Sequence, residues 1–345
     1  MRARRWLSFG ACLVPLAFGG CAPADEGAGD AGEAAPPDEV VEGGEGPSAS
    51  LLPPSGGLTA DFRAFLQANG YDVADFARDD LEGGSFGGRA FAGEAIVNQP
   101  VIFIHGNSDK ASGDSFGKTG WAASYDHFTR NGYKPAELYA TTWGPADAFA
   151  ASQQYHSKPY VMKVRRFIEA VKAYTGATKV DVIAHSMGVT LARKAIKGGT
   201  ARDALNGGSY EVGPSLKTSV DTFVGIAGGN LGLVNCFLSG PTTPTCGSTN
   251  GLYPGQLAFG VVVGRSAFLN DLLSSSGYEG SFRYSMWSTV DELVGFGGLV
   301  YGQATSRLPG QTGEVVFSSP PFGHFGLKDL TADRQLKMVK FHSTN

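Results

Sequence analysis

The chain has 345 residues, 42% of them hydrophobic, which is enough to bury the core of one α/β domain or of two small ones. Its formal net charge of −4 comes from 28 basic and 32 acidic residues, and eight of the acids lie within 21–56, which has no basic residue. Without these acids and the three arginines of residues 1–5, 25 basic and 24 acidic residues remain. This balance gives no indication of a nucleic-acid partner.

The first 20 residues are predicted to be a secretory signal. A basic start, residues 1–5, precedes an apolar stretch over 6–20 that is too short to span a bilayer. Cys21 directly follows two glycines, which resembles a bacterial lipoprotein signal and implies that this cysteine is lipidated and becomes the first mature residue. Phe18 is larger than that motif usually takes, so cleavage and secretion without a lipid is the alternative. In both cases we expect export.

Residues 21–56 consist mainly of Ala, Gly, Pro, Glu and Asp. Such a segment cannot bury enough apolar surface to order itself, so we expect a disordered tether ahead of a folded domain over 57–345. Cys236 and Cys246 are the only cysteines of that domain. Because an exported chain meets an oxidising environment, we expect a disulfide between them. Two cysteines without a nearby histidine do not fill a tetrahedral zinc site.

The apolar pattern predicts alternating helices and strands from residue 59 onward. A helix is expected over 59–70, with Thr59 as its N-cap, and residues 99–104 are typical of a strand that is buried on both faces. The next expected elements are a helix over 121–131, a strand over 137–143, a helix over 159–174, and strands over 179–183 and 222–227. This alternation predicts an α/β fold with a mostly parallel sheet and flanking helices.

The loop after the strand over 99–104 begins with His105. An acyl-transfer site needs two N–H donors for its oxyanion, and one normally comes from the loop after an early strand. The N–H of Asn107 is therefore the candidate. His105 follows the strand so directly that we expect it to hold the loop by hydrogen bonding. Three other histidines are interpreted as surface or packing residues: His127, His156 and His185.

The five residues 184–188, Ala-His-Ser-Met-Gly, separate the strand over 179–183 from a predicted helix. A serine on a sharp strand-to-helix turn is the nucleophile elbow of serine esterases. The turn requires small residues two before and two after the serine, as Ala184 and Gly188 are. Ser186 is therefore the predicted nucleophile. The N–H of Met187 opens the helix without a helical partner and points toward the future oxyanion.

Two other serines match the letters of the elbow motif better, namely Ser85 in 83–87 and Ser115 in 113–117. Neither has an apolar run that ends directly at it. With 50 glycines in the chain, such matches are expected by chance. We expect both serines to lie in glycine-rich loops.

The regular alternation fails over 231–273, the segment that holds both domain cysteines. Several of its apolar residues look exposed: Leu233, Phe237, Leu252, Tyr253, Phe259 and Phe268. We interpret the segment as a substrate-facing insertion or cap, with an ordinary packed excursion as the alternative.

In this kind of hydrolase the acid and then the histidine follow the serine. His324 is the only histidine after Ser186 besides His342 of the terminal tail. It lies between a predicted strand over 314–317 and a predicted helix over 331–341, and a histidine on such a loop can take the proton of the serine.

Asp291 is the candidate acid because it follows the predicted strand over 282–288, at the carboxyl ends of the strands where α/β sites assemble. Its neighbour Glu292 is the alternative. Asp221 starts a strand at the opposite end of the sheet, and Asp203 and Asp271 are expected at the surface.

From about residue 58 onward the chain resembles the class 2 lipases, exported α/β-hydrolases with an A-H-S-M-G elbow. The resemblance rests on the stretches 83–88, 100–109, 137–144, 181–190, 288–292 and 323–326. It implies an α/β-hydrolase fold with Ser186, Asp291 and His324 as catalytic triad. It also implies the N–H groups of Asn107 and Met187 as oxyanion hole, and esters of fatty acids as substrates.

The elbow and the stretches 171–176 and 244–248 are also similar to an extracellular depolymerase of native polyhydroxyalkanoate granules. We therefore expect a serine carboxylic ester hydrolase that cleaves fatty-acyl esters such as triacylglycerol and needs no metal or organic cofactor. A polyester depolymerase is one alternative, and a non-catalytic surface binding protein of the same fold is another. The expected partners are a lipid or polyester substrate and, through Cys21, a membrane.

Overall fold

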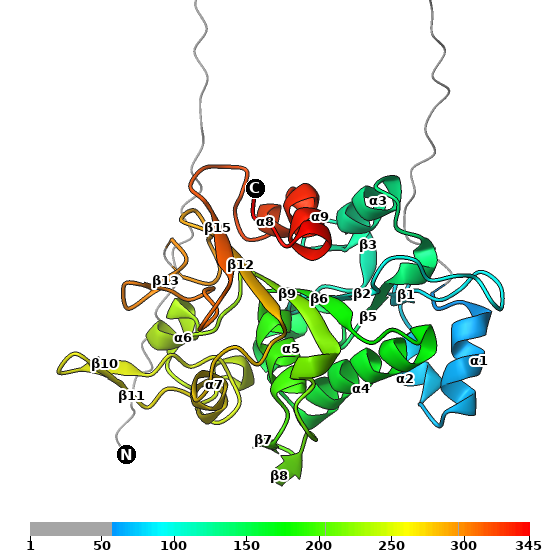
Figure 1. Ribbon diagram of the computed structural model, residues 1–345. Coiled ribbons are helices and arrows are strands. Elements are labelled where there is room, and N and C mark those ends of the chain that lie inside the picture. The colour runs from blue at the N-terminus through cyan, green and yellow to red at the C-terminus, as the bar shows by residue number, and fades with distance from the viewer. Residues whose placement is uncertain (1–56, 204, 296) are drawn as a thin grey trace, which may run out of the picture. The chain divides into compact units, whose positions relative to one another are not determined.

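The computed structural model describes residues 57–203, 205–295 and 297–345. A seven-stranded sheet in the order β1-β5-β2-β6-β9-β12-β15 forms its centre (Figure 1). Its strands are β1 (Ser85–Phe86), β2 (Val101–Ile104), β5 (Leu138–Thr141), β6 (Val180–His185), β9 (Val220–Ile226), β12 (Phe282–Ser288) and β15 (Gly313–Phe317). In this sheet, each pair of neighbouring strands from β5 through β2, β6, β9 and β12 to β15 is parallel. Only β1 pairs antiparallel, with β5. The predicted mostly parallel sheet is confirmed.

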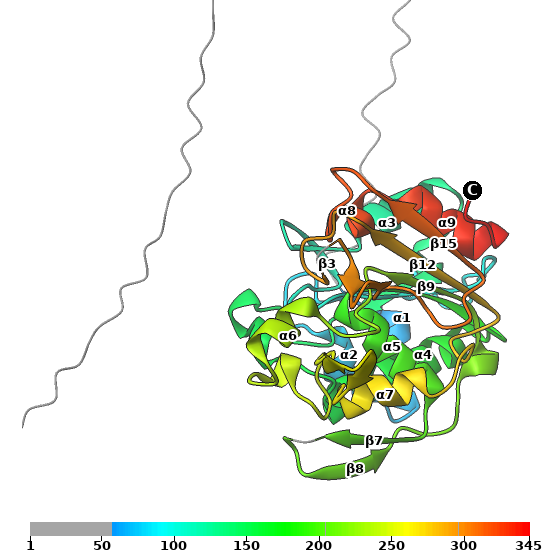
Figure 2. The ribbon, with the colours of Figure 1, turned by 90° about the vertical axis from the view of Figure 1, so that its left-hand side faces the viewer.

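Helices cover both faces of this sheet (Figures 1 and 2). In the view of Figure 1, α3 (Ala122–Arg130), α8 (Gly326–Asp329) and α9 (Ala332–Phe341) lie above it. Below it lie α1 (Ala60–Ala68), α2 (Val73–Ala77), α4 (Lys158–Thr175), α5 (Met187–Lys197) and α7 (Ala267–Leu273). Successive side chains of a strand point to opposite faces. Along β2, Ile102 and Ile104 therefore enter one core, and Val101 and Phe103 enter the other.

The predicted elements appear with their ends shifted by at most about two residues. Thr59 caps α1 as expected, because its hydroxyl accepts from the N–H of Phe62 at 3.3 Å. Between the main elements lie the short 3-10 helices η1 (Pro135–Glu137), η2 (Ala148–Gln153), η3 (Lys217–Ser219) and η4 (Pro244–Cys246). The order β2-α3-β5-α4-β6 brings the chain to residue 186 at the carboxyl end of the central strand β6.

The prediction of glycine-rich loops around Ser85 and Ser115 was wrong. Ser85 lies in the edge strand β1, fully buried, and its hydroxyl donates to the carbonyl of Ala77 at 2.6 Å. Ser115 ends a strand of one of the four two-stranded hairpins in the described part of the chain, none of which the pattern predicted. These are β3 (Ser112–Ser115) with β4 (Lys118–Gly120), β7 (Thr200–Asp203) with β8 (Gly208–Glu211), β10 (Gln256–Ala258) with β11 (Val261–Val263), and β13 (Leu299–Val300) with β14 (Gln303–Ala304).

Residues 231–273 contain α6 (Val234–Ser239), η4, the hairpin β10–β11 and α7. Of the six apolar residues expected to be exposed, Phe237 and Phe259 are exposed, and Leu233 is half-buried. Leu252, Tyr253 and Phe268 are buried instead, with at most 7% of their surface exposed. Their burial follows from packing into the core that α4 and α5 share with the sheet, so this part of the segment is a packed excursion.

The predicted signal over 1–20, Cys21 and the tether over 21–56 lie outside the described residues. Within the described part of the chain, no helix is both long enough and apolar enough to cross a membrane.

Candidate active site

Ser186 has a strained backbone at the turn from β6 to α5. Its φ of 54° and ψ of −127° are uncommon for a residue with a side chain. The turn is held because the N–H of Ser186 donates to the carbonyl of Ile226 at 2.8 Å. Gly188 must be small because a Cβ there would lie 2.3 Å from the carbonyl oxygen of His105. The elbow predicted from the sequence therefore has the expected geometry.

His324 and Asp291 form a buried pair. Nδ1 of His324 lies 3.0 Å from Oδ2 of Asp291, and each side chain is at most 3% exposed. The other carboxylate oxygen accepts from the N–H groups of Leu293 and Val294 at 2.9 and 3.0 Å. Burial alone would raise the pKa of Asp291, but the bond and charge of His324 and the two N–H groups outweigh it and lower the pKa. The carboxylate therefore stays ionised and holds a proton on Nδ1.

Glu292, the alternative acid, supports the histidine loop through the backbone. Its Oε2 accepts from the N–H of His324 at 2.9 Å. The neighbouring Gly323 leaves room for this carboxylate, since a Cβ there would lie 2.5 Å from Oε2. The structure therefore brings Asp291 to the imidazole and Glu292 to the main chain.

His185, expected to be a packing residue, lies directly under His324. Its Nε2 is 3.1 Å from the carbonyl oxygen of His324, and the two ring centroids are 4.7 Å apart. A carbonyl only accepts, so Nε2 carries the proton. Burial, with the nearby His324 and Lys328, lowers the pKa of His185 well below its ordinary value. The residue therefore stays neutral and adds no second charge beneath the imidazole.

His105 holds the loop after β2 by hydrogen bonding, as expected. Its Nε2 accepts from the N–H of Trp143 at 3.0 Å, and its Nδ1 lies 2.7 Å from the carbonyl oxygen of Gly106. The imidazole also stacks on the Trp143 indole. Burial lowers the pKa of His105 to about 4. It is therefore a neutral structural residue at the start of the loop that carries Asn107.

A buried ion pair beside this loop was not predicted. Nζ of Lys328, in α8, lies 3.2 Å from Oδ2 of Asp109 and donates to the hydroxyl of Thr119 at 2.6 Å. Asp109 also accepts from the N–H of Gly120 at 3.0 Å. The pair joins α8, which follows the histidine loop, to the loop after β2. No local pattern indicates it, because Asp109 and Lys328 are 219 positions apart in the sequence.

The candidate residues border one cavity of about 360 Å³. Ser186, Met187, His324 and Asn107 line it, so these four candidate site residues border the same space. Most of the remaining lining side chains are apolar: Phe116, Ala148, Ala151, Leu233, Leu252, Leu293, Val294 and Phe325. A cavity of this size and chemistry fits a small apolar group beside the serine.

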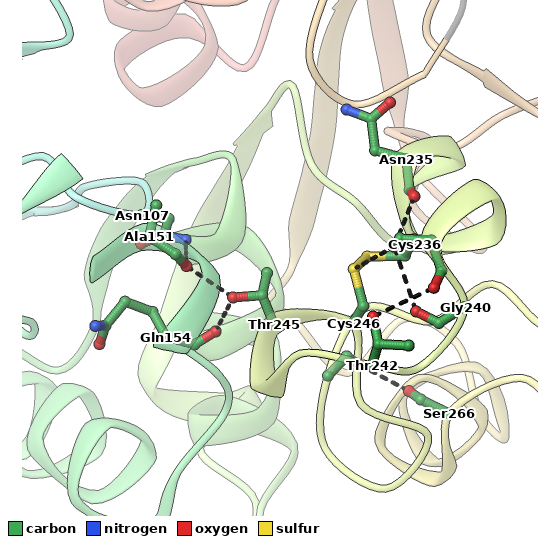
Figure 3. Close-up of a disulfide and its surroundings, with 12 residues drawn as sticks. Asn107, Ala151, Gln154, Asn235, Cys236, Gly240, Thr242, Thr245, Cys246 and Ser266 are labelled. Carbon is green, nitrogen blue, oxygen red and sulfur yellow. Dashed lines mark hydrogen bonds between the residues drawn. A yellow bond between two sulfur atoms is a disulfide. The ribbon is translucent and has the colours of Figure 1, made fainter. Parts of the chain in front are cut away.

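Part of the cavity wall comes from the region of the disulfide, which Figure 3 shows with its surroundings. Cys236 of α6 is bonded to Cys246 of η4, as predicted. Thr245, next to Cys246, donates its hydroxyl toward the carbonyls of Ala151 and Gln154 at 2.7 and 2.5 Å. The 231–273 segment thus faces the cavity with its first half, through Leu233, Asn235, Thr245 and Leu252. The substrate-facing interpretation therefore fits these four residues, of which Leu252 also packs into the core.

The remaining aspartates have other partners. Asp221 is the second residue of β9 and pairs with Lys179 and His342 at 2.8 and 3.1 Å. Asp271 pairs with Lys194 and Lys197.

Asp203 was expected at the surface, and this was wrong. It ends β7 with only 2% of its surface exposed, because it accepts from the hydroxyl of Tyr155 and the N–H of Lys158.

The histidines outside the cavity also have other partners. His156 is buried between Thr190 and the carbonyl of Asn250, and His127 lies partly exposed on α3. Within the described ranges, no three His, Cys, Asp or Glu side chains are grouped so that they could hold a metal ion.

Comparison with known proteins shows that one protein-family model matches this chain. A model described as "Lipase (class 2)" matches residues 98–337, which is more than half of the chain and includes all five candidate site residues: Asn107, Ser186, Met187, Asp291 and His324. No curated protein matches.

Solved structures match at low identity. Lipase B of Aspergillus fumigatus is 16% identical with a TM-score of 0.48, over 74% of this chain and 56% of that one. The Bacillus licheniformis lipase BlEst2 in its propeptide form is 13% identical with a TM-score of 0.43, over 74% and 52%. A monoacylglycerol lipase of Paleococcus ferrophilus is 12% identical with a TM-score of 0.41, over 75% and 98%. The chain thus spans little more than half the length of the first two.

Proposed function

Because the chain belongs to the class 2 lipase family, we propose that it is an exported serine hydrolase of carboxylic esters that works through an acyl-serine intermediate. The observation that carries this proposal is the pairing of His324 with Asp291 at 3.0 Å at the wall of a cavity that Ser186 also lines. A buried, ionised carboxylate on Nδ1 leaves Nε2 of the imidazole free to act as a base.

In the first step, His324 takes the proton of the Ser186 hydroxyl as the oxygen attacks the ester carbonyl carbon. Asp291 stabilises the imidazolium that forms. The carbonyl oxygen becomes an oxyanion, to which the N–H groups of Asn107 and Met187 donate. The N–H of Met187 is in the first turn of α5, where the helix dipole adds to the stabilisation.

Collapse of the tetrahedral intermediate breaks the bond to the alcohol, which leaves with the proton from His324. The acyl group is then attached to Ser186. His324 next takes a proton from water, whose oxygen attacks the acyl carbon through the same oxyanion site. The acid leaves and the serine recovers its proton, so the two steps need no further reactant than the ester and water.

Turnover of p-nitrophenyl esters by the purified chain tests this proposal. We expect Ser186→Ala to lower kcat by roughly four orders of magnitude or more, as removal of a serine nucleophile does elsewhere. Ser85→Ala and Ser115→Ala are matched controls, because these serines have the motif letters but lie outside the cavity lining. Full activity in Ser186→Ala would overturn the assignment.

We propose fatty-acyl esters such as triacylglycerol as the substrate class. The family and the apolar lining of the cavity support this class, since both favour an aliphatic acyl group next to the serine. The measurement is fatty-acid release from triacylglycerols of graded chain length. No release at any chain length would remove triacylglycerol from the proposal.

A polyester of hydroxyalkanoic acids is the second candidate. One of the two further stretches that are similar to a polyhydroxyalkanoate depolymerase, 244–248, contains Thr245, which lines the cavity. Clearing of native polyhydroxybutyrate granules, compared with fatty-acid release at equal enzyme concentration, separates the two substrates. A non-catalytic binding protein would neither turn over esters nor react with a fluorophosphonate at Ser186.

Lipidation of Cys21 would place the enzyme at a membrane surface. The support for it is the sequence of the first 21 residues. Mass spectrometry of the mature N-terminus from the producing cell tests it, since a diacylated Cys21 and an unmodified N-terminus differ in mass. With Cys21→Ser, membrane attachment should be lost while ester turnover is retained.

A further inference from the structure

We propose that Thr245 is a positioning residue for the oxyanion donor at Asn107, and that the Cys236–Cys246 disulfide holds it in place. This inference rests on the proposed ester hydrolysis, in which the N–H of Asn107 stabilises the oxyanion. Thr245 itself touches none of the reacting atoms. It acts through η2, the short segment between the loop that carries Asn107 and the disulfide region (Figure 3).

The carbonyl oxygen of Ala151 is the point where the two sides meet. It accepts from Nδ2 of Asn107 at 2.9 Å and from the hydroxyl of Thr245 at 2.7 Å. Figure 3 shows these two side chains approaching it from different elements. The oxyanion loop and the disulfide region are therefore connected through one backbone carbonyl.

The loop that carries Asn107 has a second bond to the same segment. The hydroxyl of Ser108 donates to the carbonyl of Asp147, the N-cap of η2, at 2.9 Å. Ser108 has a φ of 65°, a conformation that needs support from its surroundings. The oxyanion loop is thus bonded to two carbonyls of this segment, that of the N-cap Asp147 and that of Ala151 within η2.

The segment η2 cannot hold itself in place by packing, because none of its residues is buried. On the side away from Asn107, its C-terminal end is held by Thr245. The single hydroxyl of Thr245 lies 2.7 Å from the carbonyl of Ala151 and 2.5 Å from that of Gln154. The two carbonyls share the one hydrogen of this hydroxyl, so its removal weakens the attachment of the end of η2, which keeps the bond of Gln154 to Tyr160.

Thr245 is fixed in turn by its covalent neighbour. Cys246 is buried and bonded to Cys236 of α6, and the carbonyl of Thr245 accepts from the N–H of Leu252 at 2.6 Å. The disulfide therefore fixes the position from which the hydroxyl reaches η2. Leu252 also lines the cavity, so the same support holds the wall for the acyl group.

Thr245→Val tests the inference, because valine keeps the shape of threonine and removes only the hydroxyl. We expect kcat for a p-nitrophenyl ester to fall roughly 5- to 20-fold, a fraction of the loss expected for deleting an oxyanion donor. Thr245→Ser should restore most of it. The matched control is Thr242→Val in the same disulfide loop, since the Thr242 hydroxyl donates only to the carbonyl of Ser239.

A double-mutant cycle shows whether the effect passes through Ala151. Asn107→Ala removes the side-chain amide but keeps the backbone N–H. If both side chains act through the Ala151 carbonyl, the double variant should lose little more kcat than the worse single variant. If the two single losses of kcat multiply in the double variant, the connection is overturned. It is also overturned if Thr245→Val lowers the melting temperature but leaves kcat unchanged at temperatures well below the transition.

Hydrogen exchange gives a result that does not depend on activity. In Thr245→Val, backbone exchange in the peptide that contains Asn107 should rise several-fold, and it should stay unchanged in Thr242→Val. Unchanged exchange in both variants overturns the inference even if the wild type is an active esterase. A wild type that hydrolyses no ester would instead contradict the proposed function, while the exchange result would still decide whether Thr245 positions the loop.

Discussion

The nucleophile, acid and histidine positions each follow a strand of the central sheet, whereas another part of the cavity wall comes from residues 231–273, which contain no strand of that sheet. Ser186 follows β6, Asp291 follows β12 and His324 follows β15. The wall is held instead by a disulfide and by side-chain bonds to distant backbone, such as those of Thr245. The contrast suggests that the first region fixes the reaction and the second adjusts its rate and its substrate.

The largest expected effect is the loss of His324. We expect His324→Ala to lower kcat by about 10³- to 10⁴-fold, because the serine then has no base. His127→Ala is the matched control, since that histidine lies partly exposed on α3 with only Asn131 as its hydrogen-bond partner. Steady-state turnover of a p-nitrophenyl ester measures both. A loss below about tenfold in His324→Ala would mean that another group acts as the base.

Asp291 and Glu292 are neighbours with different expected roles. Asp291→Asn should lower kcat about 10²- to 10⁴-fold, because an amide cannot stabilise the imidazolium and favours the wrong tautomer. Glu292→Gln keeps an acceptor for the N–H of His324, so we expect a loss of about tenfold at most. The ratio of the two kcat values is the measurement. A larger loss in Glu292→Gln would exchange their assignments.

Removal of the disulfide tests the role of residues 231–273. Cys236→Ser with Cys246→Ser reopens a short loop and should lower the free energy of unfolding by about 2–3 kcal/mol. Because the triad residues after the strands of the central sheet remain, the folded variant should retain far more activity than His324→Ala. Urea denaturation and turnover at a temperature below the transition measure the two effects. Abolished turnover in a folded variant would remove the distinction between the two regions.

The smallest expected effect on turnover is at Asp181, on the strand that leads to Ser186. Burial raises the pKa of Asp181 to about 7, although the bonds from Gln99 and Thr222 oppose the rise. A carboxyl whose pKa is raised on folding binds its proton more tightly in the folded state than in the unfolded state. The fold is therefore more stable at a pH where this carboxyl is protonated than at a higher pH. That stability is lost as the pH rises from about 4 to about 7.

We therefore expect the free energy of unfolding to fall between pH 5 and pH 8 by about 2–3 kcal/mol more in the wild type than in Asp181→Asn. Urea denaturation of both proteins at the two pH values measures this difference. Asp181 lies at the amino end of β6, away from the cavity lining, so kcat at a fixed pH should not change. Equal losses of stability in the two proteins would contradict the raised pKa.

The sequence was sufficient for the parts of the site that local chemistry determines. The Ala184 to Gly188 elbow, Asp291 and His324 each follow a strand with a clear apolar pattern, so their strands and their order along the chain indicated that they would meet. The clash that a Cβ at Gly188 would have with the His105 carbonyl explains why the motif ends in glycine. A short local pattern was therefore enough.

The parts that the sequence did not indicate depend on partners far along the chain. Ser85 lies in a strand only because β5, more than 50 residues later, pairs with it. Leu252, Tyr253 and Phe268 looked exposed because nothing near them alternates, and they are buried by α4, α5 and the sheet. The Lys328–Asp109 pair and the Thr245 bonds likewise join residues whose proximity no periodicity encodes.

The most direct test of the proposed mechanism is the site of covalent labelling by a fluorophosphonate. Such a reagent reacts with a serine only where a base and an oxyanion hole activate it. The proposed mechanism predicts a single adduct, located by peptide mass spectrometry on Ser186. This adduct should be absent in Ser186→Ala, and it should form much more slowly in His324→Ala. An adduct on another serine, or no labelling of the folded wild type, would contradict it.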